Sequence, residues 1–590
     1  MNDPGGQQEH LNGHSGFILA VFCIVSIFVI WPARIPLPNN VQRLLLLTLR
    51  RWRIISDDEY SRTLSARRRL YFSLSLKTAP AIGVILLLAT TTIHGSTIKL
   101  GIKGDDSIKP YDVLVLFISL AYISIALDGT GALEALALWV SKRGGSSGRL
   151  LFTYLYSFFL LTACIVGNDP LILSGTPFLA YLTHHAKLEP EAWIFSEFMA
   201  ANTASAVLVS SNPTNILIAG SFSLNYLTDF TKWTILPSIV PAILTYPILT
   251  GMFWKKIPKT LTPLEIDPWS KLRDRTGAIV LSSLMLVTVA VLVGTSFVPG
   301  HAVEVWMVTM PAGVSASLFE LASDLWRPTT RRGAVHQQAT DRSAEDHSVD
   351  RTGTGATKNQ LPLDELTKSA EEEPEPEPEP EPGPESPPSR DLDHKYSRCT
   401  LKGKSRSLTS LLRSLARRFP GTTRTLARLP ITLLPFAMCE FILVRGLEQR
   451  GWIAVFARGF ANACTTPAKT VFFMGFVSAA FLCPLAGTNI GATIILVEIM
   501  RDPAFSQSPA ALADPRILLG AIYSVAMGSN IGAFSYTFAG SLAGLLWREL
   551  LADKGITVSQ LKFALVNALP LLMQTTTASA IVLGELYWFA

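Results

Sequence analysis

One apolar segment of the chain is interrupted by the stretch Ala201-Asn202-Thr203-Ala204-Ser205-Ala206-Val207-Leu208-Val209-Ser210-Ser211-Asn212-Pro213-Thr214-Asn215. A later apolar segment is interrupted by Ser529-Asn530-Ile531-Gly532-Ala533-Phe534-Ser535-Tyr536-Thr537-Phe538-Ala539-Gly540-Ser541-Leu542. In each stretch an asparagine, Asn202 or Asn530, is followed ten residues later by a helix breaker, Asn212-Pro213 or Gly540-Ser541. Polar residues of a soluble loop explain either stretch alone, but not the repeated spacing inside apolar flanks. The pattern predicts two interrupted helices, each followed by a half-helix whose free N–H groups favour an anionic or lone-pair-bearing substrate.

The composition places these helices in a membrane. The chain has 590 residues, of which 49% are hydrophobic and 16% are charged, whereas a soluble domain is about 25% charged. The apolar residues form blocks of roughly 15 to 22, near the ~20 that a membrane-spanning helix needs. The formal charge of +6 comes from basic residues in loops between these blocks, where the orientation rule places them. We therefore expect an integral multi-pass protein with the lipid bilayer as its partner, and no nucleic acid.

The order of segments repeats within the chain. Each half contains three apolar spans, a short amphipathic piece (Gly131–Val140 or Trp452–Phe460), a hairpin with a Gly/Asn tip, an interrupted helix and a last span. Such repeats, when inverted, are typical of secondary transporters with a site near the bilayer midplane. The predicted fold is an all-α polytopic membrane protein of two inverted repeats, with about ten transmembrane helices, two re-entrant hairpins and two interrupted helices.

The predicted organisation has four parts. They are an N-terminal span with a basic cytoplasmic loop (1–77), the first transporter half (78–322), a disordered cytoplasmic linker with a Glu-Pro tract (323–429) and the remainder of the second half (430–590), which itself begins near residue 277. The loop from Arg34 to Lys77 carries ten basic residues against three acidic ones, so it is expected in the cytoplasm, with the N-terminus outside. Other basic loops share that side only if Leu150–Leu182 enters and returns as a re-entrant hairpin.

The linker differs in composition from everything around it. The tract Glu371–Glu385 alternates Glu and Pro, cannot bury apolar area and is expected to be disordered. The following segment, Lys395–Arg428, holds ten basic residues and no acid. It can lie on anionic lipid, pair with the Glu tract, or serve only as a solvated tether, and the sequence leaves these alternatives open.

The two hairpin tips differ in charge. The first reads Gly167-Asn168-Asp169-Pro170, between two arms that each look about half a bilayer long. A carboxylate at that depth costs at least ~2.5 kcal/mol unless it finds a partner or a proton, so Asp169 is a functional candidate. The alternative is a helix N-cap with Pro170 at the first helical position. The second tip, Thr488-Asn489 with flanking glycines, offers no carboxylate; a glycine-mediated helix crossing is the alternative there.

These tips and breaks resemble the ion transporter superfamily, and most closely its arsenite/antimonite permease branch, near the citrate-transporter-like branch. The likeness lies in Gly167–Leu179, Ala201–Asn215 and Gly528–Trp547, and it covers about two thirds of the chain. The resemblance implies that the tips and breaks form the transport site, carried by Asn168, Asp169, Asn202, Asn212, Thr214, Asn215, Thr488, Asn489, Asn530 and Ser541. The chain departs from the permeases at Gly167 and Ala204–Val207, and its long Glu-Pro loop favours a eukaryotic, fungal offshoot.

We expect a secondary active transporter for a small inorganic or organic solute. Arsenite/antimonite-type efflux coupled to an ion gradient is preferred, because neither tip nor break carries a lysine or arginine and a neutral hydroxide such as As(OH)3 needs only hydrogen bonds. Citrate or dicarboxylate transport, Na+/H+ antiport, and a non-transporting scaffold or receptor stay as alternatives. The chain shows no HExxH or P-loop motif, so we expect neither an enzyme nor a cofactor. Asp169 is expected to carry the coupling proton, with Na+ as an open variant; the plasma membrane is preferred over the vacuolar membrane, and a homodimer stays open.

Overall fold

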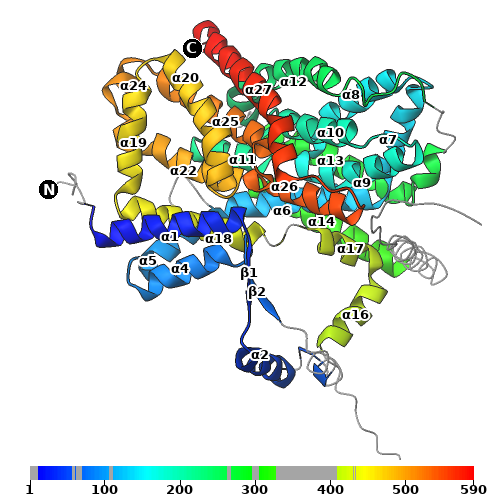
Figure 1. Ribbon diagram of the computed structural model, residues 1–590, viewed down its shortest axis with the longest axis horizontal. Coiled ribbons are helices and arrows are strands. Elements are labelled where there is room, and N and C mark those ends of the chain that lie inside the picture. Colours follow the sequence, from blue (N-terminus) through cyan, green and yellow to red (C-terminus); the bar gives the residue numbers. More distant parts are fainter. Residues whose placement is uncertain are drawn as a thin grey trace, which may run out of the picture.

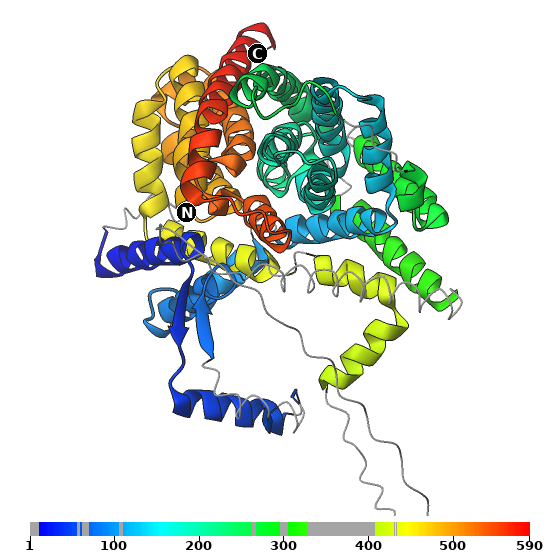
Figure 2. The ribbon, with the colours of Figure 1, turned by 45° about the vertical axis from the view of Figure 1, so that its right-hand side comes forward.

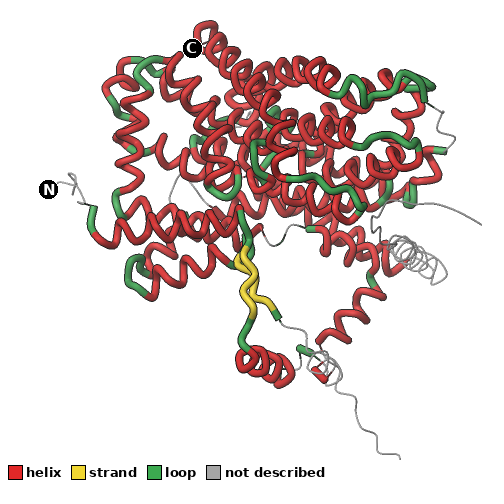
Figure 3. The backbone as a smooth tube through the Cα atoms, viewed as in Figure 1, coloured by secondary structure: helices red, strands yellow, loops and turns green. Residues whose placement is uncertain are grey.

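The computed structural model describes residues 11–52, 54–55, 60–61, 70–104, 110–261, 267–295, 305–326, 408–429, 431 and 433–589. The described chain is a helical bundle with a single two-stranded sheet (Figure 1, Figure 3). The Glu-Pro tract lies outside the described residues, so its predicted disorder stays a prediction. The predicted all-α architecture is confirmed.

The first half supplies ten helices in the predicted order. They are α1 (Gly13–Ile30), α4 (Ala79–Ala89), α5 (Gly95–Lys103), α6 (Pro110–Gly129), α7 (Ala132–Arg143), α8 (Gly148–Val166), α9 (Asn168–His185), α10 (Glu191–Ala204), α11 (Pro213–Ser221) and α12 (Lys232–Met252). A π-helical turn, Tyr226–Thr231, leads into α12.

The second half follows the same order. It consists of α13 (Arg275–Thr295), α14 (Val305–Trp326), α18 (Leu433–Gln449), α19 (Trp452–Ala463), α20 (Pro467–Phe476), α21 (Cys483–Leu485), α22 (Asn489–Arg501), α23 (Pro503–Ser506), α24 (Pro509–Ala513), α25 (Arg516–Ile531), α26 (Leu542–Asp553) and α27 (Gln560–Phe589). The amphipathic helices α7 and α19 both start after a glycine with a φ of 80°, Gly131 and Gly451. Only glycine adopts that backbone without a steric cost, so the same local turn recurs in both halves.

The halves are interleaved. The half-helix α11 packs against α22, the hairpin arm of the other half, and α26 packs against α9 in the reciprocal way. The last helices of the two halves, α12 and α27, also lie side by side (Figure 1). Each half therefore completes its packing with an element of the other, and their opposite orientation in the membrane stays a prediction.

The number of membrane spans is not fixed by helix length. Seven described helices are long and apolar enough to cross a membrane, or eight if the bent pair α6–α7 counts as one span. The expected ten include α4 and α18, which are shorter, and the interrupted pairs α10–α11 and α25–α26. The expected half-bilayer arms are wrong for the first hairpin, because α8 and α9 have 19 and 18 residues and thus extend ~27 Å each.

The basic N-terminal loop contains regular structure that the sequence did not reveal. Strands β1 (Ala33–Pro36) and β2 (Tyr71–Leu74) form an antiparallel ribbon, and α2 (Asn39–Arg51) lies beyond it. Helix α16 (Leu408–Arg418) belongs to the basic end of the linker. Figures 1 and 2 show α2 and α16 projecting from the same face of the bundle, and the placement of both basic segments in the cytoplasm stays a prediction.

The C-terminal end of the linker is docked on the bundle. Helix α17 (Pro420–Arg428) packs against α6 and α14. The Asp324 carboxylate of α14 accepts hydrogen bonds from Gly421 N at 3.1 Å and from Thr422 N at 2.9 Å. A carboxylate from another helix thus caps the first turn of α17, where it meets the positive end of the helix dipole. The predicted linker boundary at residue 429 falls after this docked helix.

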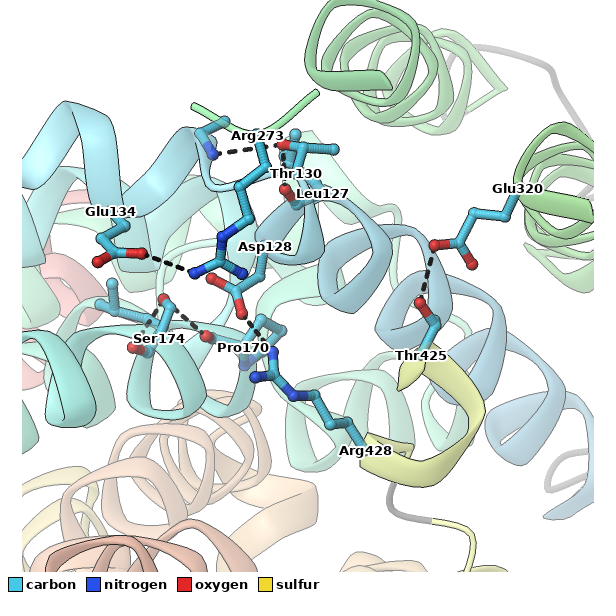
Figure 4. A network of polar contacts seen from close by, with 12 residues as sticks. Leu127, Asp128, Thr130, Glu134, Pro170, Ser174, Arg273, Glu320, Thr425 and Arg428 are labelled. Atoms are coloured by element: carbon cyan, nitrogen blue, oxygen red, sulfur yellow. Dashed lines mark hydrogen bonds and ion pairs between the residues drawn. The ribbon is translucent and has the colours of Figure 1, made fainter. Parts of the chain in front are cut away.

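A polar cluster holds the other end of α17. Arg428 forms an ion pair of 2.8 Å with Asp128, at the bend between α6 and α7. Thr425 donates to Glu320 of α14 at 2.9 Å. Figure 4 shows Asp128 between Arg273 and Arg428, beside the start of α9. The end of the linker therefore touches the bend that precedes the first hairpin.

Candidate functional site

The first break is built by asparagine side chains. Helix α10 ends at Ala204, and after a short 3-10 turn Asn212 becomes the N-cap of α11 by accepting a hydrogen bond from Thr214 N at 3.1 Å. Asn215 Nδ2 donates to the carbonyl oxygens of Ser205 at 2.7 Å and Leu208 at 2.9 Å. Unwound backbone at this depth must find internal partners, and Asn215 supplies two of them.

The second break follows the same plan with a hydroxyl. Helix α25 ends at Ile531, two 3-10 turns follow, and Ser541 becomes the N-cap of α26. Ser541 Oγ accepts from Gly544 N at 2.9 Å and donates to the carbonyl oxygen of Ala533 at 2.9 Å. Ser541 therefore does for the second break what Asn212 does for the first.

Asn530 joins the two breaks. Its Oδ1 accepts from Asn212 Nδ2 at 2.8 Å and from Ser205 Oγ at 3.2 Å, and its Nδ2 donates to Asn215 Oδ1 at 2.7 Å. All four of these side chains are buried. The interrupted helices thus meet at one buried polar centre, as their matched spacing suggested.

Each hairpin tip reaches the interrupted helix of its own half. Asn168 Nδ2 donates to Asn202 Oδ1 at 3.1 Å, while Asn489 Nδ2 donates to the carbonyl oxygen of Ser529 at 3.3 Å. Thr488 is the N-cap of α22 and accepts from Gly491 N at 3.3 Å. The starts of α9, α11, α22 and α26 therefore gather around the ends of α10 and α25.

Asp169 differs from the other predicted residues because its side chain forms no hydrogen bond with a described residue. It is the second residue of α9 and does not cap it, because Gly167, with a φ of 93°, occupies the cap position. The alternative that placed Asp169 at the cap and Pro170 first in the helix is wrong. Instead, Asn168 Oδ1 accepts the Asp169 N–H at 2.9 Å. The half-buried Asp169 carboxylate has no ion pair or hydrogen bond to another described residue. No described side chain therefore neutralises its charge.

The site is rich in hydrogen-bonding groups and poor in charge. One N–H of each of the four helix starts is bonded to a side chain of that start, namely Asn168, Asn212, Thr488 or Ser541. Among the residues that the structure describes, no lysine or arginine forms a hydrogen bond or ion pair with a predicted site residue. The arrangement can bind a small solute by exchanging amide and hydroxyl hydrogen bonds.

Several polar residues around the site were not predicted from the sequence. Ser205, inside the first break, bonds to Asn530. Thr203 of α10 donates to Gln574 Oε1 of α27 at 2.7 Å, and Gln574 Nε2 donates to Thr245 Oγ1 of α12. These two hydrogen bonds link α10, α27 and α12. Glu197 of α10 is fully buried and accepts from Thr176 of α9. In the sequence, Glu197 is the one acid within the apolar stretch 192–204, and this is the signal that could have marked it.

Sequence comparisons match parts of this chain to known transport proteins. Residues 64–326 match the family model described as citrate transporter. An arsenical pump membrane protein of Escherichia coli is 30% identical over 213 residues, which are 35% of this chain and 48% of that protein. A second arsenical pump membrane protein of Escherichia coli is 33% identical over 184 residues, which are 30% of this chain and 43% of that protein. The alignments thus span just under half the length of these relatives.

A solved structure also aligns with the whole chain. The YdaH transporter of Alcanivorax borkumensis covers 98% of both chains at 12% sequence identity and a TM-score of 0.44. At that TM-score the likeness carries no argument about the site. The family match and the curated relatives therefore support the predicted superfamily, while the roles of the individual site residues rest on the geometry above.

Proposed function

We propose that this chain belongs to the ion transporter superfamily, beside the citrate transporter family and the arsenical pump membrane proteins that it matches, and that it expels a neutral trivalent hydroxide of arsenic or antimony in exchange for an ion. Secondary transport of a small solute is the function that the family match and the relatives support. The substrate, its direction and its coupling ion are our proposal.

The observation that carries the proposal is the neutral polar centre around Asn530. Its amide and hydroxyl groups bond to one another and to the helix starts, and no basic side chain joins them among the described residues. A multivalent anion in such a buried place needs a counter-charge. A neutral hydroxide needs only donors and acceptors, and Asn168, Asn202 and Asn530 supply both.

In this proposal the Asp169 carboxylate binds and releases the exchanged ion. Uphill export of a neutral solute requires an ion that moves down its own gradient, and a carboxylate without a protein partner can take up and release a proton. Carboxylate and amide oxygens also suit a hard cation such as Na+. Asp169 at the first tip is adjacent in sequence to Asn168, which bonds to Asn202, so an ion there is close to the substrate groups.

Citrate or dicarboxylate transport is the second candidate. The match of residues 64–326 to the citrate transporter family favours it, as do the four gathered helix starts with their positive dipole ends. An anion there has to be accompanied by cations, because the site offers no basic side chain among the described residues.

Reconstituted vesicles separate these candidates. Purified protein in proteoliposomes is given arsenite, antimonite, citrate, a dicarboxylate or Na+, each under imposed pH and Na+ gradients. We expect gradient-driven movement of arsenite and antimonite, and none of citrate. Movement of citrate but not of arsenite contradicts the preferred substrate and supports the second candidate. No movement of any solute beyond protein-free vesicles contradicts both.

A further inference from the structure

A second carboxyl group lies at the hairpin tip that was predicted to have none. Glu440 sits in the middle of α18 and is 1% exposed. Its Oε2 is buried and has no hydrogen-bond partner, and its carboxyl forms no ion pair among the described residues. The sequence reasoning considered only the residues of the tip itself, so it missed this group from another helix.

The geometry places this carboxyl against the first turn of α22. A Cβ built on Gly491, the third residue of α22, would lie 3.6 Å from Glu440 Oε2 and 2.9 Å from the Ala486 carbonyl oxygen. Two oxygens therefore flank the same point of the tip. On its other side the tip meets α1, where a Cβ on Gly487 would lie 2.9 Å from Val29. The second tip is held between α1 and α18, with the carboxyl facing it.

Among the described residues, no charged side chain of the surrounding helices pairs with Glu440. Helix α18 packs against α1, α4, α5, α6, α19 and α22. The charged residues described on these helices are either exposed or paired with one another: Lys99, Lys103 and Arg458 are exposed, Glu498 pairs with Arg445 and Arg501, and Asp128 pairs with Arg428. His14 of α1 contacts Thr92, and Glu448 of α18 pairs with Arg445. Cys439 is the other titratable neighbour on α18.

A bare carboxylate in this position is physically costly. Burial of an unpaired carboxylate in a low-dielectric interior costs several kcal/mol, and the usual remedies are a proton or a bound cation. Glu440 Oε2 and the Ala486 carbonyl oxygen are both acceptors near Gly491, which suits either a proton on the carboxyl or a small hard cation. The dipole at the start of α22 favours negative charge on Glu440 once that cation leaves.

We propose that Glu440, together with the start of α22, forms a binding site for a monovalent cation, either H+ or Na+, at the second hairpin tip. It mirrors Asp169 at the first tip, so that each tip carries one exchangeable cation although only one tip has a carboxylate in its own sequence. The role of this cation in transport rests on the proposed function, whereas the cation site itself does not.

The site is tested on the purified protein without transport. Wild-type protein is compared with Glu440→Gln and with the control Glu448→Gln, which removes a half-exposed carboxylate from the same helix. Infrared difference spectra recorded between acidic and alkaline buffer report protonated carboxyl groups, and thermal unfolding in NaCl against choline chloride reports Na+ binding. If the cation is H+, we expect one protonated-carboxyl band to disappear in Glu440→Gln only. If it is Na+, we expect the Na+-dependent rise in melting temperature to disappear in Glu440→Gln only.

The outcomes separate this inference from the proposed function. If Glu440→Gln changes neither the band nor the Na+ effect, the cation site is refuted. If Glu440→Gln does not fold, Glu440→Asp takes its place and is expected to shift the pH midpoint of the band or to weaken the Na+ effect; no change in either refutes the site. In vesicles that transport a solute, we expect Glu440→Gln to halve the number of cations exchanged per solute. A cation site without any solute transport contradicts the proposed function alone.

Discussion

Asn212 Nδ2 donates a hydrogen bond of 2.8 Å to Asn530 Oδ1, and the two residues stand 318 positions apart in the chain. Asn530 returns a bond of 2.7 Å to Asn215. The two interrupted helices therefore do not merely occupy equivalent places in the two halves. They share one set of buried amides, so a substitution in one break also changes the hydrogen bonds of the other.

Replacement of Asn530 by Ala is expected to damage both transport and stability. The change removes the Asn530 acceptor of Asn212 Nδ2 and the Asn530 donor to Asn215 Oδ1, at a cost of about 1–3 kcal/mol for each buried group left unpaired. Transport in proteoliposomes and thermal unfolding in detergent measure the two effects. The control is Asn12→Ala, which removes only the N-cap of α1; it is expected to lower stability by about 1 kcal/mol and to leave transport unchanged. Normal transport by Asn530→Ala would remove Asn530 from the site.

Replacement of Asp169 by Asn is expected to abolish gradient-driven accumulation while the protein still folds. The carboxylate has no partner among the described residues, so the amide breaks no observed contact, yet it cannot exchange a proton. Gradient-driven uptake and solute exchange at equilibrium are measured in the same vesicles, and exchange serves as the internal control. Accumulation at the wild-type level by Asp169→Asn contradicts the coupling role.

Deletion of Glu371–Glu385 is expected to leave transport unchanged. The tract lies outside the described residues, and its composition cannot form a packed core. Transport is measured at matched surface abundance. A loss of transport at equal abundance assigns the tract a regulatory role.

Replacement of Asp324 by Ala is expected to release α17 from the bundle. The substitution removes the acceptor of the Gly421 and Thr422 N–H groups, at a cost of about 0.5–2 kcal/mol for a lost cap. Trypsin cleavage after Arg424 and Arg428 reports the release, because both sites lie on α17. We expect faster cleavage in Asp324→Ala than in Asp324→Asn, which keeps one acceptor oxygen. Equal protection in the two variants shows that α17 is held without the cap.

The sequence pattern predicted the helix breaks and the tips well because their causes are local. Asn212-Pro213 and Ser541 cap new helices wherever the chain places them, and Gly167 allows the sharp turn before α9. The one local error concerns Asp169. Its position at the cap seemed natural with Pro170 next, but the preceding glycine took that place.

What the sequence could not reveal depends on contacts between distant elements. Glu440 is a candidate only because it lies near Gly491 of another helix. Likewise, α17 is docked because Asp324 of α14 caps its first turn. An isolated acid in an apolar span is a recognisable signal, and it marks Glu440 as well as Glu197. The pattern does not say which tip such an acid faces, because that depends on how the two halves interleave.

The interleaving also determines when each helix can meet its packing partner during synthesis. When α9 and α11 have left the ribosome, their partners α26 and α22 have not yet been made. Translation from α11 to the end of α26 takes on the order of 20 to 60 s at ~5–20 residues per second. During that time Asn212 and Asn215 sit in the bilayer without Asn530, and each unsatisfied polar group there costs several kcal/mol. Until the second half is made, the first half therefore lacks α26 and α22, the helices against which α9 and α11 pack.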